Sequence, residues 1–181
     1  MEKTKIYNNG LVIKEVYFEN IKIYSNSVIK EVQDVATFST KTPATGGMGS
    51  TTKVSLTYTS VSHTETTYGS MILSDGGCLI QKPIKTLVLY FTVPLKIGGY
   101  ASGDSQKNNV VVYKNGTKVG SGAANISSST TTRYVTITLT DLVVGDLITA
   151  KLEGQSGCGC NTNGKAVTMQ ATATLDAEVE E

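Results

Sequence analysis

Apolar and polar residues alternate along most of the chain after residue 53. Val54, Leu56 and Tyr58 alternate with Ser and Thr, and five apolar residues from Val167 to Leu175 alternate with Thr and Gln. Successive side chains of a β-strand point to opposite faces, so such a run predicts a strand with one buried and one wet face. Inserting one residue in the last run would exchange its two faces.

Two runs depart from this alternation because they are apolar on both faces. They are Leu87–Val93 and Val110–Tyr113. Runs of this kind are typical of central strands that are covered on both sides, or of strands at a subunit interface. The second reading is the main indication in the sequence of an oligomer.

Turn signals divide the chain into short strands. Asn115-Gly116 between apolar runs predicts a tight hairpin, and Val144-Gly145-Asp146 predicts a turn into Leu147–Leu152. Spacings of this kind give about eight strands at roughly ten-residue intervals. The sequence therefore predicts an all-β fold, an antiparallel β-sandwich of the jelly-roll type, preceded by an N-terminal β-hairpin extension.

The N-terminal extension contains an imperfect repeat, in which Lys5–Val16 returns as Lys22–Val32. Each copy places Asn-Gly or Asn-Ser between apolar stretches, which predicts two hairpins, with a short helix near Val28–Val35 as the competing prediction. Hairpins of this size are marginal alone, so they must lie against the main domain, another copy or a partner. The residues expected to form this oligomer or anchoring interface are Ile6, Tyr7, Val12, Ile13, Ile23, Tyr24, Val28 and Ile29.

The chain divides into four predicted parts. Residues 1–36 are the N-terminal repeat and anchoring hairpins, and residues 37–52 are a linker rich in Gly, Ser and Thr. Residues 53–176 form the jelly-roll sandwich, and residues 177–181 are an acidic tail.

Composition and charge argue against some classes of partner. The net charge is +1 and no basic stripe is present, which argues against nucleic acid. No run approaches the length of a membrane span, so no membrane is expected. The N-terminus lacks the apolar core of a secretory signal, and three cysteines are too few for a disulfide framework, so synthesis in a reducing host cytoplasm is predicted.

Cys158-Gly159-Cys160 lies in a Gly-rich loop, and Cys78 is the third cysteine of the chain. Three thiolates could in principle meet at one metal ion, but structural zinc takes four ligands and paired cysteines are normally separated by two to four residues. Free thiols or a disulfide are favoured, and no cofactor is expected.

Nothing in the sequence indicates a catalytic site. The only histidine, His63, ends a predicted strand, and no nucleophile motif accompanies it. Tyr100 and Asp104 lie in a Gly-rich loop that is a candidate ligand site, although a loop tyrosine can equally pack back over the sandwich. We therefore predict that the chain is not an enzyme.

A family resemblance adds to this interpretation. The run Val110–Val119 with its Asn115-Gly116 turn, followed by Tyr134–Leu139 and by Leu142–Ile148 with Gly145-Asp146, resembles the compact jelly rolls of phage fibre and receptor-binding proteins. It is also similar to the trimeric C1q/TNF-like domains of spore-surface proteins. In those families one strand ends at an Asn-Gly turn and a later Gly-Asp opens another.

The resemblance implies a virion structural protein, made without a signal peptide and found on the particle. It would be a homotrimer that serves as a decoration, fibre or tail-tip component, docks on capsid or tail proteins by its N-terminal segment, and exposes its jelly roll to a host surface glycan. One alternative is a carbohydrate-binding sandwich, which needs exposed aromatics on one sheet face. Another is a cellular surface-layer or appendage subunit, which needs an export signal.

Overall fold

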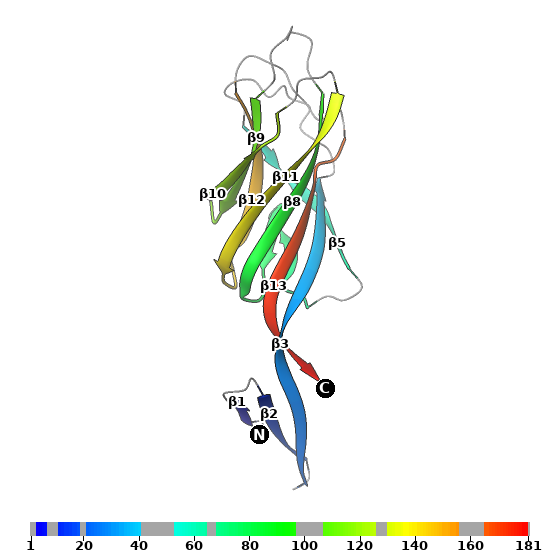
Figure 1. Cartoon of the computed structure of the whole chain (residues 1–181), viewed down its shortest axis with the longest axis vertical. Helices are drawn as coiled ribbons and strands as arrows, with labels where there is room; N and C mark the ends of the chain where they lie inside the picture. Colours follow the sequence, from blue (N-terminus) through cyan, green and yellow to red (C-terminus); the bar gives the residue numbers. More distant parts are fainter. Residues whose placement is uncertain are drawn as a thin grey trace.

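The computed structural model describes residues 3–6, 11–18, 21–40, 53–64, 68–96, 107–125, 130–155 and 165–180, and all regular structure in these ranges is β. Two antiparallel sheets form a sandwich with a smaller group of strands below it (Figure 1). In chain order the strands are β1 Lys3–Ile6, β2 Leu11–Phe18, β3 Ile21–Thr40, β4 Lys53–Leu56, β5 Tyr58–His63, β6 Met71–Ser74, β7 Gly77–Ile80, β8 Ile84–Lys96, β9 Lys107–Lys114, β10 Thr117–Ala123, β11 Thr130–Leu142, β12 Leu147–Gln155 and β13 Thr168–Glu180.

The strand order is that of a jelly roll. One sheet runs β1-β2-β3-β13-β8-β11 with β5 also on β3, and the other runs β10-β9-β12-β7-β6 with β4 also on β12. From β3 onward the chain crosses repeatedly between the sheets, so that β13, the last strand, lies between β3 and β8. This confirms the predicted fold class. Eight strands carry the jelly-roll order, and β4, β5 and β6 are additional to the predicted eight.

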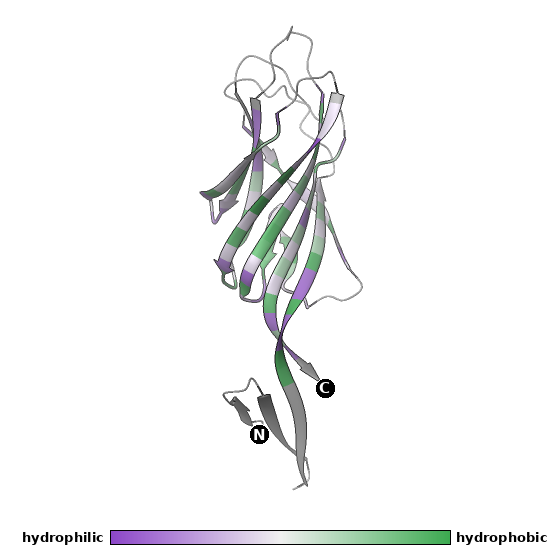
Figure 2. Cartoon of the chain, viewed as in Figure 1, coloured by the Kyte–Doolittle hydropathy of each residue, from purple (hydrophilic) through white to green (hydrophobic). Residues whose placement is uncertain are grey.

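One core lies between the two sheets and follows the predicted alternation. From Val167, just before β13, to Leu175 within it, the five odd-numbered residues are at most 1% exposed. Figure 2 shows the same alternation as green and paler bands along β8, β11 and β13. The largest fully buried side chains come from both sheets and include Phe38, Tyr58, Met71, Ile80, Leu87, Leu89, Phe91, Ile148 and Leu152. Burying a large apolar side chain stabilises the fold by roughly 1.5–3 kcal/mol.

The turns confirm the predictions made for them. Asn115 and Gly116 have φ values of 51° and 79°, the left-handed pair that a two-residue hairpin turn requires. At the other turn, the Asp146 N–H donates to the Val143 carbonyl at 3.1 Å. These turns join β9 to β10 and β11 to β12.

Close approach of backbone closes one side of the sandwich. β10 is an edge strand of one sheet and β11 an edge strand of the other. A Cβ added at Gly122 of β10 would overlap Cγ1 of Val135, and one at Gly120 would lie 2.7 Å from Cγ2 of Ile137. Glycine at these positions lets β10 cover the buried face of β11.

Two predictions about the first 60 residues are wrong. No hairpin turn occurs at Asn26-Ser27 and no helix at Val28–Val35, because β3 is one continuous strand of 20 residues. Its first part pairs with β2 in a ladder from Leu11↔Val28 to Phe18↔Ile21, so the chain reverses between Phe18 and Ile21 instead. The first predicted hairpin is present as β1 and β2, with Ile6 opposite Val12.

The alternating run from residue 53 to His63 is also two strands rather than one long strand. β4 pairs with β12 in one sheet, whereas β5 pairs with β3 in the other. The chain crosses at Thr57, and the Tyr58 N–H then donates to the Gly76 carbonyl at 3.0 Å. Residues 37–40, expected in a linker, are the end of β3, and residues 177–180 of the expected tail are the end of β13.

Candidate functional site

The N-terminal strands bring most of the predicted interface residues into one small sheet. Directly paired residues of an antiparallel sheet share a face, and the face changes at every residue. The registers therefore place Ile6, Val12 and Ile23 on one face of the β1-β2-β3 sheet, and Ile13, Tyr24 and Val28 on the other. Ile29 follows in β3, where it pairs with Glu178 of β13. Tyr7 lies outside the described residues.

The face that holds Ile6 is the more apolar of the two. The register adds Val16 opposite Ile23 and Phe18 opposite Ile21 to it, and Lys14 is its one charged position. The other face holds four charged positions, Lys3, Lys5, Glu15 and Lys22, beside Leu11, Ile13, Tyr17, Tyr24 and Val28. The two faces of this small sheet thus differ mainly in charge, with one charged position against four, a difference that the sequence repeat did not show.

A cluster of charges lies where β3 and β13 extend beyond the sandwich. Glu31 of β3 is directly opposite Asp176 of β13, an arrangement of like charges that destabilises a strand pair. Lys85 of β8 bridges both: its Nζ lies 2.9 Å from Asp176 Oδ1 and 3.5 Å from Glu31 Oε1. The hydrogen bond to Asp176 raises the pKa of Lys85, and its own partial desolvation opposes this. The lysine thereby offsets the repulsion at this junction.

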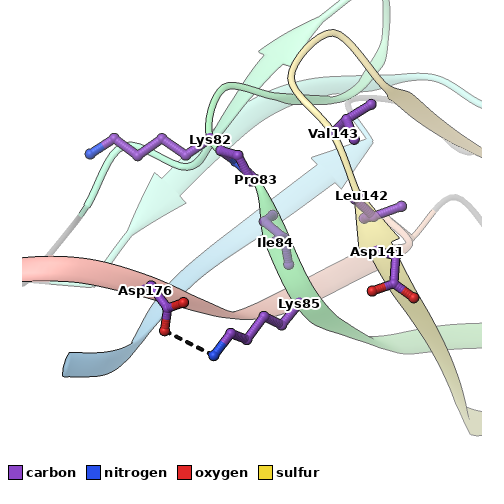
Figure 3. A pocket seen from close by; sticks show the side chains of 8 residues that line it. All are labelled: Lys82, Pro83, Ile84, Lys85, Asp141, Leu142, Val143 and Asp176. Atoms are coloured by element: carbon purple, nitrogen blue, oxygen red, sulfur yellow. Dashed lines mark ion pairs between the residues drawn. The ribbon is translucent and has the colours of Figure 1, made fainter. Parts of the chain in front are cut away.

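Beside this cluster is a hollow of about 470 Å³ (Figure 3). Pro83, Ile84 and Lys85 of the β8 region lie between Asp176 on one side and the end of β11 on the other, while the side chain of Lys82 points away from it. The lining residues are Lys82, Pro83, Ile84, Lys85, Asp141, Leu142, Val143 and Asp176. With Lys82 directed away, the charged side chains at the hollow are Lys85, Asp141 and Asp176, beside the apolar Pro83, Ile84, Leu142 and Val143. That chemistry suits a side chain of another protein better than it suits catalysis.

The two turns named in the family resemblance are in contact with each other. The Asn115 side-chain amide donates to Asp146 Oδ1 at 2.7 Å, and Asn115 Oδ1 accepts from the Leu147 N–H at 2.8 Å. Asp146 Oδ2 accepts from the Val143 N–H at 3.0 Å. Burial alone would raise the pKa of Asp146, but these hydrogen bonds and the charge of Lys114 outweigh it and lower the pKa. Asn115 and Asp146 are therefore a structural lock between two turns.

The remaining candidates carry little chemistry. Cys78 is fully buried in β7, and burial raises the pKa of its thiol to about 12, so it is an unreactive core residue. Cys158, Cys160, Tyr100 and Asp104 lie outside the described residues, so their predicted roles stay untested. His63 is exposed at the end of β5, opposite Ala36.

Within the described ranges, no three His, Cys, Asp or Glu side chains gather where they could hold a metal ion. The same ranges contain no helix long and apolar enough to cross a membrane.

No family model matches the sequence, and no curated protein does. Among solved structures, the one titled "PRD1 vertex protein P5" aligns with 93% of this chain and 84% of that chain, at 14% identity and a TM-score of 0.49. A likeness this distant carries no conclusion about what the chain does.

Proposed function

We propose that the chain is a structural protein of a virus particle that docks through its β1-β2-β3 sheet and exposes the jelly roll. It is a surface decoration, fibre or tail-tip component that self-associates, contacts other virion proteins and has no enzymatic role. The expectation that the chain is a virion protein comes from the resemblance of residues 110–148 to phage fibre domains.

The observation that carries the proposal is the continuity of β3. Its 20 residues span roughly 65 Å at about 3.3 Å per residue. Residues 21–28 pair with β2 in the small sheet, and residues 27–39 pair with β13 in the sandwich. One hydrogen-bonded strand thus belongs to both parts (Figure 1). A docking sheet and an exposed domain joined in this way transmit force without a flexible joint.

Two further features support docking at this end. One face of the β1-β2-β3 sheet has a single charged position among six apolar ones, and such a face on so small a sheet needs a covering partner. The hollow beside Lys85 lies at the same end of the sandwich as the point where β3 leaves it (Figures 1 and 3). Both would face the particle.

The test is co-sedimentation with virus particles that lack the chain. Deleting residues 1–20 removes β1 and β2 and leaves every residue of β3 that pairs with β13. The deletion variant should fold and stay in the supernatant, whereas the full chain should sediment with the particles. Co-sedimentation of the deletion variant at the full-chain level would contradict the proposal.

A finer experiment compares charges introduced on the two faces of the β1-β2-β3 sheet. Val16→Asp with Ile23→Asp places two charges on the face that holds Ile6. Tyr17→Asp with Lys22→Asp is the corresponding cross-strand pair on the opposite face, and it changes the net charge by one unit more. The first pair should abolish attachment and the second should reduce it much less.

The carbohydrate-binding alternative has one observation in its favour. Tyr90 and Tyr134 are 39% and 61% exposed on the same sheet face. Binding of a glycan array by the monomer, lost in Tyr134→Ala, would favour this alternative over the virion proposal.

A further inference from the structure

Beyond the row of Glu31 and Asp176, which Lys85 bridges at one end, the outer face of the sheet β5-β3-β13-β8-β11 contains no charged residue over 19 positions. The register aligns its residues in rows, such as Thr37, Gln170, Tyr90 and Thr136 across four strands. Ten of the positions are threonine, and we call this surface the threonine face. It consists of Ser60, Ser62, Gln33, Val35, Thr37, Ser39, Thr168, Gln170, Thr172, Thr174, Thr86, Val88, Tyr90, Thr92, Thr132, Tyr134, Thr136, Thr138 and Thr140.

The threonine face is open in the single chain. Figure 1 looks onto β11, β8 and β13, and no described strand lies over them. Val88 is only half-buried and Tyr90 is 39% exposed, although both belong to the run that is apolar on both faces. The outward half of that run therefore lacks a cover within the described part of the chain.

The opposite outer face, which we call the charged face, is different. Lys53 and Lys151 surround Glu153 and Tyr113 there: Lys53 Nζ lies 3.3 Å from Glu153 Oε1, and the Tyr113 hydroxyl donates to Glu153 at 2.8 Å. Lys151 Nζ lies 4.9 Å from the centre of the Tyr113 ring. On this face Val111 is 1% exposed, so its own chain covers it.

We propose that the threonine face is the contact surface between copies of this chain. This inference deepens the self-association in the proposed function and rests on it. Interface cores are depleted of charge and enriched in tyrosine, as this face is. Threonine hydroxyls both donate and accept, and their side chains are stiff, so a face of threonine can be its own complement at little entropic cost.

The size of the face agrees with this role. Five strands about 4.8 Å apart and nine residues of about 3.3 Å give a footprint of roughly 24 by 30 Å, or about 700 Å². A stable interface takes about 800 Å² from each partner. The small net charge of +1 leaves little long-range repulsion between copies.

The arrangement of the two exposed tyrosines favours a protein over a sugar. The Tyr90 and Tyr134 rings are stacked, with centroids 5.6 Å apart and an interplanar angle of 15°. Each ring covers one face of the other, so at most one face of each ring is left for a sugar to stack on. A charged partner surface is disfavoured as well, because the threonine face has no charge to pair with it.

The experiment is sedimentation of the full chain and of three variants with one added charge each. Thr138→Lys and Gln170→Lys place a lysine at exposed positions of the threonine face, and Ser121→Lys places one at an exposed position of β10 in the other sheet. The unmodified chain and Ser121→Lys should sediment as the same oligomer. Thr138→Lys and Gln170→Lys should weaken association at least about tenfold, with unchanged circular dichroism.

Each of the other possible outcomes contradicts a different part of the proposal. A monomeric full chain removes self-association from the proposed function and the inference with it. An oligomer that all three variants leave intact removes the threonine face as the interface, while docking through β1-β2-β3 stands. A monomer that binds glycans through Tyr134 makes the face a sugar site instead.

Discussion

The two outer faces of the sandwich rest on the same core and differ in how their polar groups are satisfied. On the charged face, lysine, glutamate and tyrosine side chains contact one another, and Val111 is buried. On the threonine face, no charge is present and Val88 stays partly open. The comparison teaches that a strand can be apolar on both faces for two reasons. In β9 the chain itself buries the outward Val111, whereas in β8 we propose that a second copy covers the outward side chains.

The largest expected effect separates the inside of β8 from its outside. Leu89→Ala removes a fully buried side chain and should lower the free energy of unfolding by about 2–5 kcal/mol. Val88→Ala, one residue away on the threonine face, should cost less than about 1 kcal/mol in the monomer, because that side chain is only half-buried. Urea unfolding of both variants measures this.

The same pair sharpens the comparison when protein concentration is varied. If a second copy covers Val88, the cost of Val88→Ala should grow with concentration, while that of Leu89→Ala should keep its size relative to the unmodified chain. A concentration-independent cost for Val88→Ala would contradict this.

A smaller effect is expected at the lock between the turns. Asp146→Asn removes the carboxylate that accepts from Val143 and Asn115, and should cost about 1–3 kcal/mol at neutral pH. The pKa of Asp146 is lowered in the folded chain, so its contribution is complete above the unfolded value of about 3.9 and is lost as the pH falls through the folded pKa.

The stability difference between Asp146→Asn and the unmodified chain should therefore shrink on acidification below about pH 4. Thermal unfolding at several pH values measures it. Asn115→Ala is the companion variant, since it removes the other half of the lock. A difference that persisted unchanged into acid would mean that the carboxylate charge has no part in it.

The smallest effect is expected on the charged face. Glu153→Gln weakens the contacts with Lys53 and Tyr113 near the surface, where such a pair contributes about 0.2–1 kcal/mol. Salt screens the contact, so the difference from the unmodified chain should largely vanish at about 1 M salt. The mass of the oligomer should not change, because the charged face is proposed to stay exposed to solvent in the oligomer.

The sequence predicted the fold better than it predicted the interaction surfaces. The alternation of apolar and polar residues predicts which side chains of a strand are buried. Asn115-Gly116 predicts a turn because both residues can adopt the left-handed conformation. Each of these signals lies within a few neighbouring residues of the sequence. The turn expected at Asn26-Ser27 failed because pairing with β2 and β13 keeps β3 extended through it. The crossing at Thr57 was missed because alternation continues across it unchanged.

The threonine face could not be read from any one segment. Only β8, apolar on both faces over Leu87–Val93, departs from the ordinary alternation of apolar and polar residues, and the absence of charge emerges only when the registers place five strands side by side. One signal was available beforehand: the outward positions from Thr132 to Thr140 and from Thr168 to Thr174 contain no Lys, Arg, Asp or Glu. Long outward runs of this kind are a reason to expect a contact surface.

The central claim is that copies of the chain meet through the threonine face, and the most direct test is hydroxyl-radical labelling of tyrosines in the full chain over a range of concentrations. Tyr134 is 61% exposed in the single chain, and Tyr113 on the charged face is the internal reference. We predict that labelling of Tyr134 falls as association proceeds while labelling of Tyr113 stays constant. Equal labelling of Tyr134 in monomer and oligomer would contradict the account.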